Sequence, residues 1–135
     1  SDAFGLKAGV YKYTYRDPDL DYAELGLNFT AGSFFADAYL GIDETGPSSA
    51  PVDNKNNYYD VGYTYEKYTL KYGMTDNDAL DTDYSHLDLT YAYNDNLSFT
   101  LSGVVDADDA SLAAGGKDPL FVVSYKLPLD LPAAK

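Results

Sequence analysis

The sequence predicts an all-β fold, because two kinds of side chain alternate along nearly every extended stretch of the chain. In residues 21–30, one parity carries Ala23, Leu25, Leu27 and Phe29, and the other carries mainly polar or small side chains. A period of two places each set on its own face of a strand. The pattern recurs from end to end without a helical segment, so we expect strands joined by turns and loops throughout.

Eight strands are expected from this alternation. Most have about 9–11 residues, a length that crosses a bilayer when the strand is tilted. In chain order they are residues 4–16, 21–30, 34–43, 58–66, 68–75, 84–94, 97–106 and 119–127.

The first three strands differ in how clean the alternation is. The first is the least regular. Its polar side chains are Lys12, Thr14 and Arg16, and they lie on the polar face only if the tyrosines between them lie on the apolar face. These tyrosines are Tyr11, Tyr13 and Tyr15. The second alternates as described above. The third places apolar side chains at every second position: Phe34, Ala36, Ala38, Leu40 and Ile42.

The last five strands continue the same apolar parity. Its members are Val61, Tyr63 and Tyr65, then Tyr68, Leu70, Tyr72 and Met74, then Leu87, Leu89, Tyr91 and Tyr93, then Leu97, Phe99, Leu101 and Val105, and finally Phe121, Val123, Tyr125 and Leu127. Proline follows at positions 128 and 132, so we expect the tail at residues 128–135 to be irregular.

The connections alternate in length. Those at residues 31–33, 66–67 and 94–96 are tight and contain turn-forming residues. Those at 45–57, 76–83 and 107–118 are longer. The link at 17–20 is short, but because connections alternate between the two ends of the strands, it lies at the same end as the longer ones. An up-and-down meander therefore gathers the tight turns at one end and the long acidic loops at the other, as outer-membrane barrels do.

The polar parity indicates which way the apolar face points. Solvated strand faces are usually rich in Lys, Glu, Arg and Thr, whereas this set has Gly, Ser and Thr with a few charges of both signs. Small side chains suit the narrow lumen of an eight-stranded barrel. We therefore predict a single domain, residues 1–127, folded as an eight-stranded antiparallel up-and-down β-barrel of outer-membrane type.

Two groups of residues follow from this orientation. We expect a lumen charge network of Lys12, Glu24, Asp37, Asp60, Glu66, Lys71, His86, Asp88 and Lys126. We expect a membrane girdle of outward-facing aromatic side chains at the tight-turn end, namely Phe29, Phe34, Tyr65, Tyr68 and Tyr93. The alternative is a soluble or surface β-barrel or sandwich with the apolar face as its core, which binds a small ligand or self-assembles.

Two segments resemble a known family. Residues 20–39 (LDYAELGLNFTAGSFFADAY) and residues 57–101, especially NYYDVGYTYEKYTLKYGMTDND and the stretch that begins YSHLDLTYAY, are similar to the TorF-type porins of proteobacteria. The resemblance covers about two-thirds of the chain and implies an outer-membrane β-barrel with a transport role. The family's opening Tyr/Phe-Arg-Gly motif is absent here. The chain is then either a C-terminal portion of a longer barrel or a smaller relative.

Composition and motifs bound the chemistry. The formal net charge is −13 with nine Lys and Arg, which argues against nucleic-acid binding. With no cysteine, the chain has neither disulfides nor a thiolate metal site. No phosphate loop, dinucleotide fingerprint or zinc spacing is present, so we expect no cofactor.

Catalysis is the weaker interpretation of the only histidine. His86 and Asp88 share a strand face and resemble a base with its orienting carboxylate, but no serine has a recognisable nucleophile context. We therefore expect a lumen histidine and no enzyme activity.

The acidic loop offers a second candidate chemistry. Asp76, Asp78, Asp81 and Asp83 supply the oxygen ligands that Ca²⁺ takes, although their spacing is not that of an EF-hand. The alternatives are weak calcium binding and a solvated acidic loop. The expected location is the bacterial outer membrane, in contact with the lipid bilayer. Lipopolysaccharide is a further candidate partner, and a homo-oligomer stays open.

Overall fold

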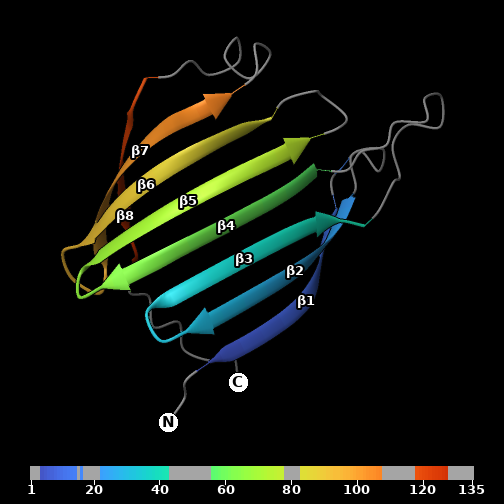
Figure 1. Cartoon of the computed structure of the whole chain (residues 1–135), viewed down its shortest axis with the longest axis horizontal. Coiled ribbons are helices and arrows are strands. Elements are labelled where there is room, and N and C mark those ends of the chain that lie inside the picture. The colour runs from blue at the N-terminus through green and yellow to red at the C-terminus, as the bar shows by residue number, and fades with distance from the viewer. Residues whose placement is uncertain are drawn as a thin grey trace.

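In the computed structural model, the described residues form one curved antiparallel sheet of eight strands that follow one another in chain order (Figure 1). The structure describes residues 4–14, 16, 22–42, 56–77, 83–107 and 118–127. The strands are β1 (Gly5–Tyr13), β2 (Tyr22–Ala31), β3 (Phe34–Gly41), β4 (Asn56–Tyr65), β5 (Tyr68–Asn77), β6 (Tyr84–Ala92), β7 (Leu97–Ala107) and β8 (Leu120–Tyr125). The predicted all-β, up-and-down architecture is confirmed. Within these residues no helix is long and apolar enough to span a membrane.

Tight turns join the even-numbered strands to the next strand. Gly32 has a φ of 60° in the turn between β2 and β3, and Glu66 has a φ of 53° between β4 and β5. Glycine tolerates this left-handed conformation, whereas glutamate is strained in it. Between β6 and β7, the side-chain oxygen of Asn94 accepts hydrogen bonds from the backbone N–H groups of Asn96 (2.9 Å) and Leu97 (2.8 Å).

The two faces of the sheet differ in chemistry and in exposure. On what we call the apolar face, Val61, Leu89 and Leu101 are 55%, 48% and 52% exposed. On the opposite, polar face, the carboxylates Asp60 and Asp88 are only 8% and 9% exposed. Among the described residues no second layer covers the apolar face, because the strands make one sheet. The exposure is thus the reverse of a soluble sandwich.

Aromatic rings lie against glycines on the polar face and help to cover it. Phe35 of β3 pairs with Gly62 of β4, and a Cβ built on Gly62 would overlap the Phe35 ring. The ring of Tyr11 lies over Gly26 in the same way. Pairing of this kind lets a large ring cover backbone that glycine leaves bare.

The predicted closed barrel is not present, since β1 and β8 form the two edges of the sheet and do not pair among the described residues (Figure 1). Alternation and tight turns fix which strands are neighbours, but they do not determine how the first and last strands meet. Following directly opposed partners from Gly5 of β1 leads across the sheet to Lys71 of β5, Asp88 of β6 and finally Leu120 of β8. From this common level β1 continues toward the long connections and β8 toward the tight turns, so the register is staggered across the sheet.

The tail predicted at residues 128–135 and most of the long connections lie outside the described residues.

Candidate functional site

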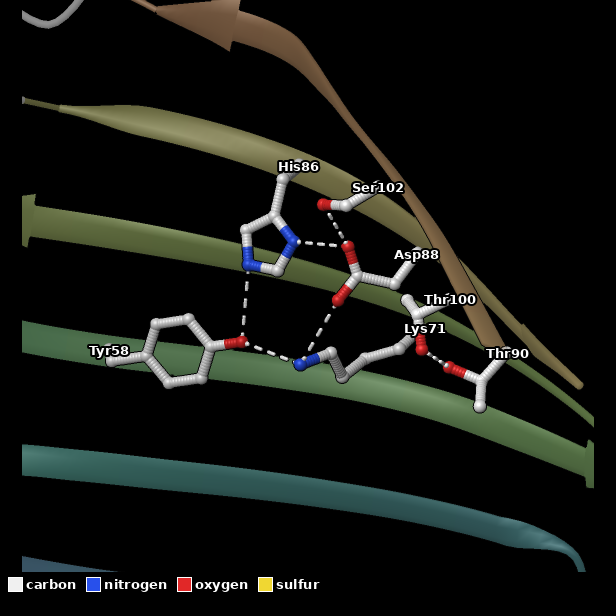
Figure 2. A network of polar contacts seen from close by, with 7 residues as sticks. All are labelled: Tyr58, Lys71, His86, Asp88, Thr90, Thr100 and Ser102. Atoms are coloured by element: carbon white, nitrogen blue, oxygen red, sulfur yellow. Dashed lines mark hydrogen bonds and ion pairs between the residues drawn. The ribbon is translucent and has the colours of Figure 1, made fainter. Parts of the chain in front are cut away.

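A polar network centred on Asp88 joins strands β4 to β7 on the polar face (Figure 2). The Oδ1 atom of Asp88 accepts a hydrogen bond from the Ser102 hydroxyl at 2.6 Å and lies 3.0 Å from Nδ1 of His86. Its Oδ2 atom lies 3.3 Å from the ammonium nitrogen of Lys71. One carboxylate thus connects three neighbouring strands.

Tyr58 of β4 closes the network on its other side. Its hydroxyl lies 3.2 Å from Nε2 of His86 and accepts a hydrogen bond from the Lys71 ammonium at 3.2 Å. Both ring nitrogens of His86 therefore face polar groups, Asp88 on one side and Tyr58 on the other. The His86 ring lies against Gly73 of β5, where a Cβ would overlap it. A side chain at position 73 would therefore displace the imidazole.

The network contains a serine, a histidine and an aspartate, as a catalytic triad does, but they are not connected in the order of a triad. The Ser102 hydroxyl donates to Asp88 and not to His86, so the serine is not placed as a nucleophile activated by the imidazole. Lys71 and Asp88 balance each other's charge, with side-chain exposures of 29% and 12%. The arrangement suits a cross-strand clamp that fixes the register of β4 to β7.

Paired hydroxyls continue the polar face toward the tight turns. The Thr90 and Thr100 hydroxyls of β6 and β7 lie 2.8 Å apart (Figure 2). Those of Thr64 and Thr69, in β4 and β5, lie 3.0 Å apart. Such cross-strand pairs stabilise sheets modestly.

An aromatic row crosses the same face toward β1. Ring centroids lie 6.2 Å apart between Tyr11 and Tyr39, 6.4 Å between Tyr39 and Tyr58, and 6.0 Å between Tyr58 and His86. Tyr39 pairs with Gly26 of β2, as His86 pairs with Gly73 of β5. The rings thus bridge the glycine-bearing strands.

The structure brings together part of the predicted lumen charge network. Lys71, His86 and Asp88 form the cluster just described. Asp37 and Asp60 lie opposite each other on β3 and β4, on the same face. Glu24 lies apart from both groups, and its Oε1 accepts a hydrogen bond from the Tyr13 hydroxyl at 2.8 Å.

Three members of that predicted network lie elsewhere. Lys12 pairs with Ala23 and shares the apolar face with Leu25, because the odd-numbered tyrosines of β1 occupy the polar face. Glu66 is exposed in the turn after β4, since the strand ends at Tyr65. Lys126 is exposed beyond the end of β8.

The five residues predicted as a membrane girdle lie on the apolar face near the tight turns, where Tyr65 pairs with Tyr68. All are exposed: Phe29 43%, Phe34 62%, Tyr65 63%, Tyr68 52% and Tyr93 56%. Their contact with a membrane interface stays a prediction.

Only half of the predicted calcium ligands can be placed. Asp78 and Asp81 lie outside the described residues. Asp83 accepts a hydrogen bond from the backbone N–H of Asn77 at 3.0 Å. Within the described part of the chain, no group of three or more His, Asp or Glu side chains is arranged to hold a metal ion.

The sequence analysis missed the contributions of Tyr58, Tyr11 and Tyr39. Tyr58 shares its parity with Asp60, so the alternation alone places it on the polar face. For Tyr11 the signal was ambiguous, because tyrosine suits either an apolar or a polar face. The neighbouring residues Leu6, Ala8 and Val10 favour the observed orientation, since they set the apolar parity of β1.

No protein-family model matches the chain, and neither a curated protein nor a solved structure matches it. The TorF-type resemblance therefore rests on the residues quoted above alone.

Proposed function

We propose that this protein is an outer-membrane β-barrel protein of Gram-negative bacteria, with a porin-like or structural role and no catalytic activity. The observation that carries the proposal is the inverted exposure of the two faces. Large apolar side chains such as Leu89 and Leu101 are about half exposed, while Asp60 and Asp88 are buried. In water this arrangement leaves apolar area exposed on a scale that soluble monomers rarely show. Against lipid the same area is removed from water.

The edges of the sheet are part of the proposal. Unpaired backbone N–H and C=O groups are costly in hydrocarbon, so a membrane sheet has no free edge. We propose that β1 and β8 are paired in the bilayer, with each other or with the edges of a second copy. The stagger of the strands, which places Leu120 of β8 opposite Gly5 of β1 across the sheet, supports this pairing of the edges. A tilted sheet closes into a barrel only when its register is staggered.

Charges at the rim fit the lipid headgroup region. Lys12 lies on the apolar face near the end of β1 that leads to the long connections, next to the exposed ring of Tyr11 on the opposite face. A lysine at this height extends its ammonium to the interface while its methylenes stay in the apolar layer. Lipopolysaccharide phosphates are the partner that we propose for it.

Extraction and gel migration test the proposal. The full chain, expressed with an export signal in a Gram-negative host, should fractionate with the outer membrane and need detergent for release. In mild detergent the folded protein should migrate differently before and after boiling, as closed barrels do. A soluble, monodisperse protein in detergent-free buffer would contradict the membrane assignment and favour a soluble sheet that binds a ligand or self-assembles.

The native mass in detergent tells the two kinds of edge pairing apart. The mass of one chain means that β1 and β8 pair with each other, and the mass of two or more means that copies complete the barrel.

A further inference from the structure

Two carboxylates oppose each other on the polar face. Asp37 of β3 and Asp60 of β4 are directly paired residues, and like charges in that relation destabilise a sheet. The chain is already strongly acidic, with a formal net charge of −13. A positive charge between the two strands would relieve this repulsion.

Asp60 is buried without its full set of partners. The residue is 8% exposed, and its Oδ1 atom has no hydrogen-bond partner among the described residues. Leaving a buried charged acceptor unsatisfied costs free energy. Asp37 has a hydrogen-bond partner, because the Asn28 side-chain amide donates to its Oδ1 at 2.8 Å. The deficit therefore centres on Asp60.

The ion pairs among the described residues do not include Asp37 or Asp60. Among the described residues, the ion pairs join Lys71 and His86 to Asp88, at 3.3 and 3.0 Å. The Lys71 ammonium also donates a hydrogen bond to the Tyr58 hydroxyl. Neither cation forms an ion pair with Asp37 or Asp60.

Aromatic rings flank the carboxylate pair along both strands. On the polar face, the neighbouring pair toward the tight turns is Phe35 with Gly62. The neighbouring pair toward the long connections is Tyr39 with Tyr58. The Tyr58 ring already has an ammonium near its face, with the Lys71 nitrogen 5.8 Å from the centroid. Carboxylates bordered by aromatic faces are the surroundings that attract ammonium groups.

A cavity borders the Asp37 side of the pair, and Asp60 is not among the residues that line it. It has a volume of about 200 Å³ and lies beside Asp37, with Asn28 and Phe35 in its wall. Lys7 also lines it, but this side chain is exposed and forms no ion pair with Asp37 among the described residues. The space accommodates a ligand of a few heavy atoms.

We propose that Asp37 and Asp60 bind a small organic cation of the alkylammonium class. A divalent metal fits less well, because the described residues supply no third carboxylate or imidazole here. An ammonium needs only acceptors and ring faces, and both are present. The site lies on the face opposite Leu89 and Leu101, so it does not depend on whether the apolar face contacts lipid.

The test is an NMR titration of the full folded chain with methylammonium chloride, against sodium chloride at equal ionic strength. Wild type should show saturable shifts confined to β2, β3 and β4. Asp60→Asn and Asp37→Asn should each weaken binding by about tenfold or more. Glu66→Gln is the matched control: it removes one negative charge from an exposed turn, and affinity should stay within about twofold.

A second measurement guards against a variant that fails to fold. Without ligand, Asp60→Asn should raise the urea midpoint of unfolding, because the substitution removes the repulsion with Asp37. Methylammonium should raise the midpoint of the wild type but not that of Asp60→Asn. The proposal is overturned if wild type shows no saturable shift, or if Glu66→Gln weakens binding as much as Asp60→Asn. It is also overturned if Ca²⁺ saturates the site and methylammonium does not, or if the pair holds a proton at neutral pH that no ligand displaces.

Discussion

Replacing Asp88 with alanine should destabilise the fold far more than removing an exposed carboxylate. The change removes one acceptor from three partners at once: the Ser102 hydroxyl at 2.6 Å, Nδ1 of His86 at 3.0 Å and the Lys71 ammonium at 3.3 Å. Because Asp88 is only 9% exposed, water cannot readily take its place.

The magnitude follows from what each partner loses. A buried donor left unsatisfied costs about 1–3 kcal/mol, and we assign about 1 kcal/mol each to Ser102 and His86 at the low end of that range. Lys71 is 29% exposed and recovers part of its solvation, so its loss adds about 1 kcal/mol or less. The expected total is about 2–3 kcal/mol. Asp88→Asn keeps an acceptor for Ser102 and should cost about half as much.

The assay is urea unfolding of the protein in detergent micelles, followed by far-UV circular dichroism. Asp95→Ala is the control, because Asp95 lies in an exposed turn and should cost at most about 0.5 kcal/mol. The reasoning is refuted if Asp88→Ala and Asp95→Ala shift the unfolding midpoint equally, since Asp88 would then be solvated.

Three other substitutions test separate parts of the structure. Glu66→Gly should stabilise the protein by about 0.5–1 kcal/mol in the same urea assay, because it relieves a φ of 53°; a loss of stability would show that the turn carries no strain. Gly62→Ala should destabilise by about 1–2 kcal/mol, since its Cβ overlaps Phe35, and the cost should fall in Gly62→Ala/Phe35→Leu; additive costs in that double variant would contradict the contact. Leu89→Lys should cost about 2–4 kcal/mol for folding into lipid vesicles, whereas a cost near zero would place Leu89 in water.

The sequence was sufficient to predict most of the sheet because its signal is local. Alternation fixes which side chains share a face, and tight turns fix which strands are neighbours. The pairing of Tyr65 with Tyr68 follows from a two-residue turn, and the shared face of Lys71, His86 and Asp88 follows from parity plus register. These parts of the polar network were therefore predictable.

Other features depend on interactions that alternation does not encode. Lys12 was assigned to the wrong face because the tyrosines of this strand were expected on the apolar face, whereas the ring of Tyr11 covers Gly26 on the polar face. Glu66 was predicted to end a strand with its side chain in the lumen, but the strand ends one residue earlier, at Tyr65. Closure depends on how two distant edges meet, which no local pattern records.

The contact of the apolar face with lipid is the claim on which the account depends, and site-directed spin labelling in vesicles tests it most directly. The chain has no cysteine, so Leu101→Cys and Thr100→Cys each give a single label, on opposite faces of β7. A label at Leu101 should collide freely with dissolved oxygen and poorly with a water-soluble nickel chelate, and a label at Thr100 should lack that oxygen-rich signature. Ready access of the nickel chelate to the Leu101 label, in protein that remains folded, would contradict the account.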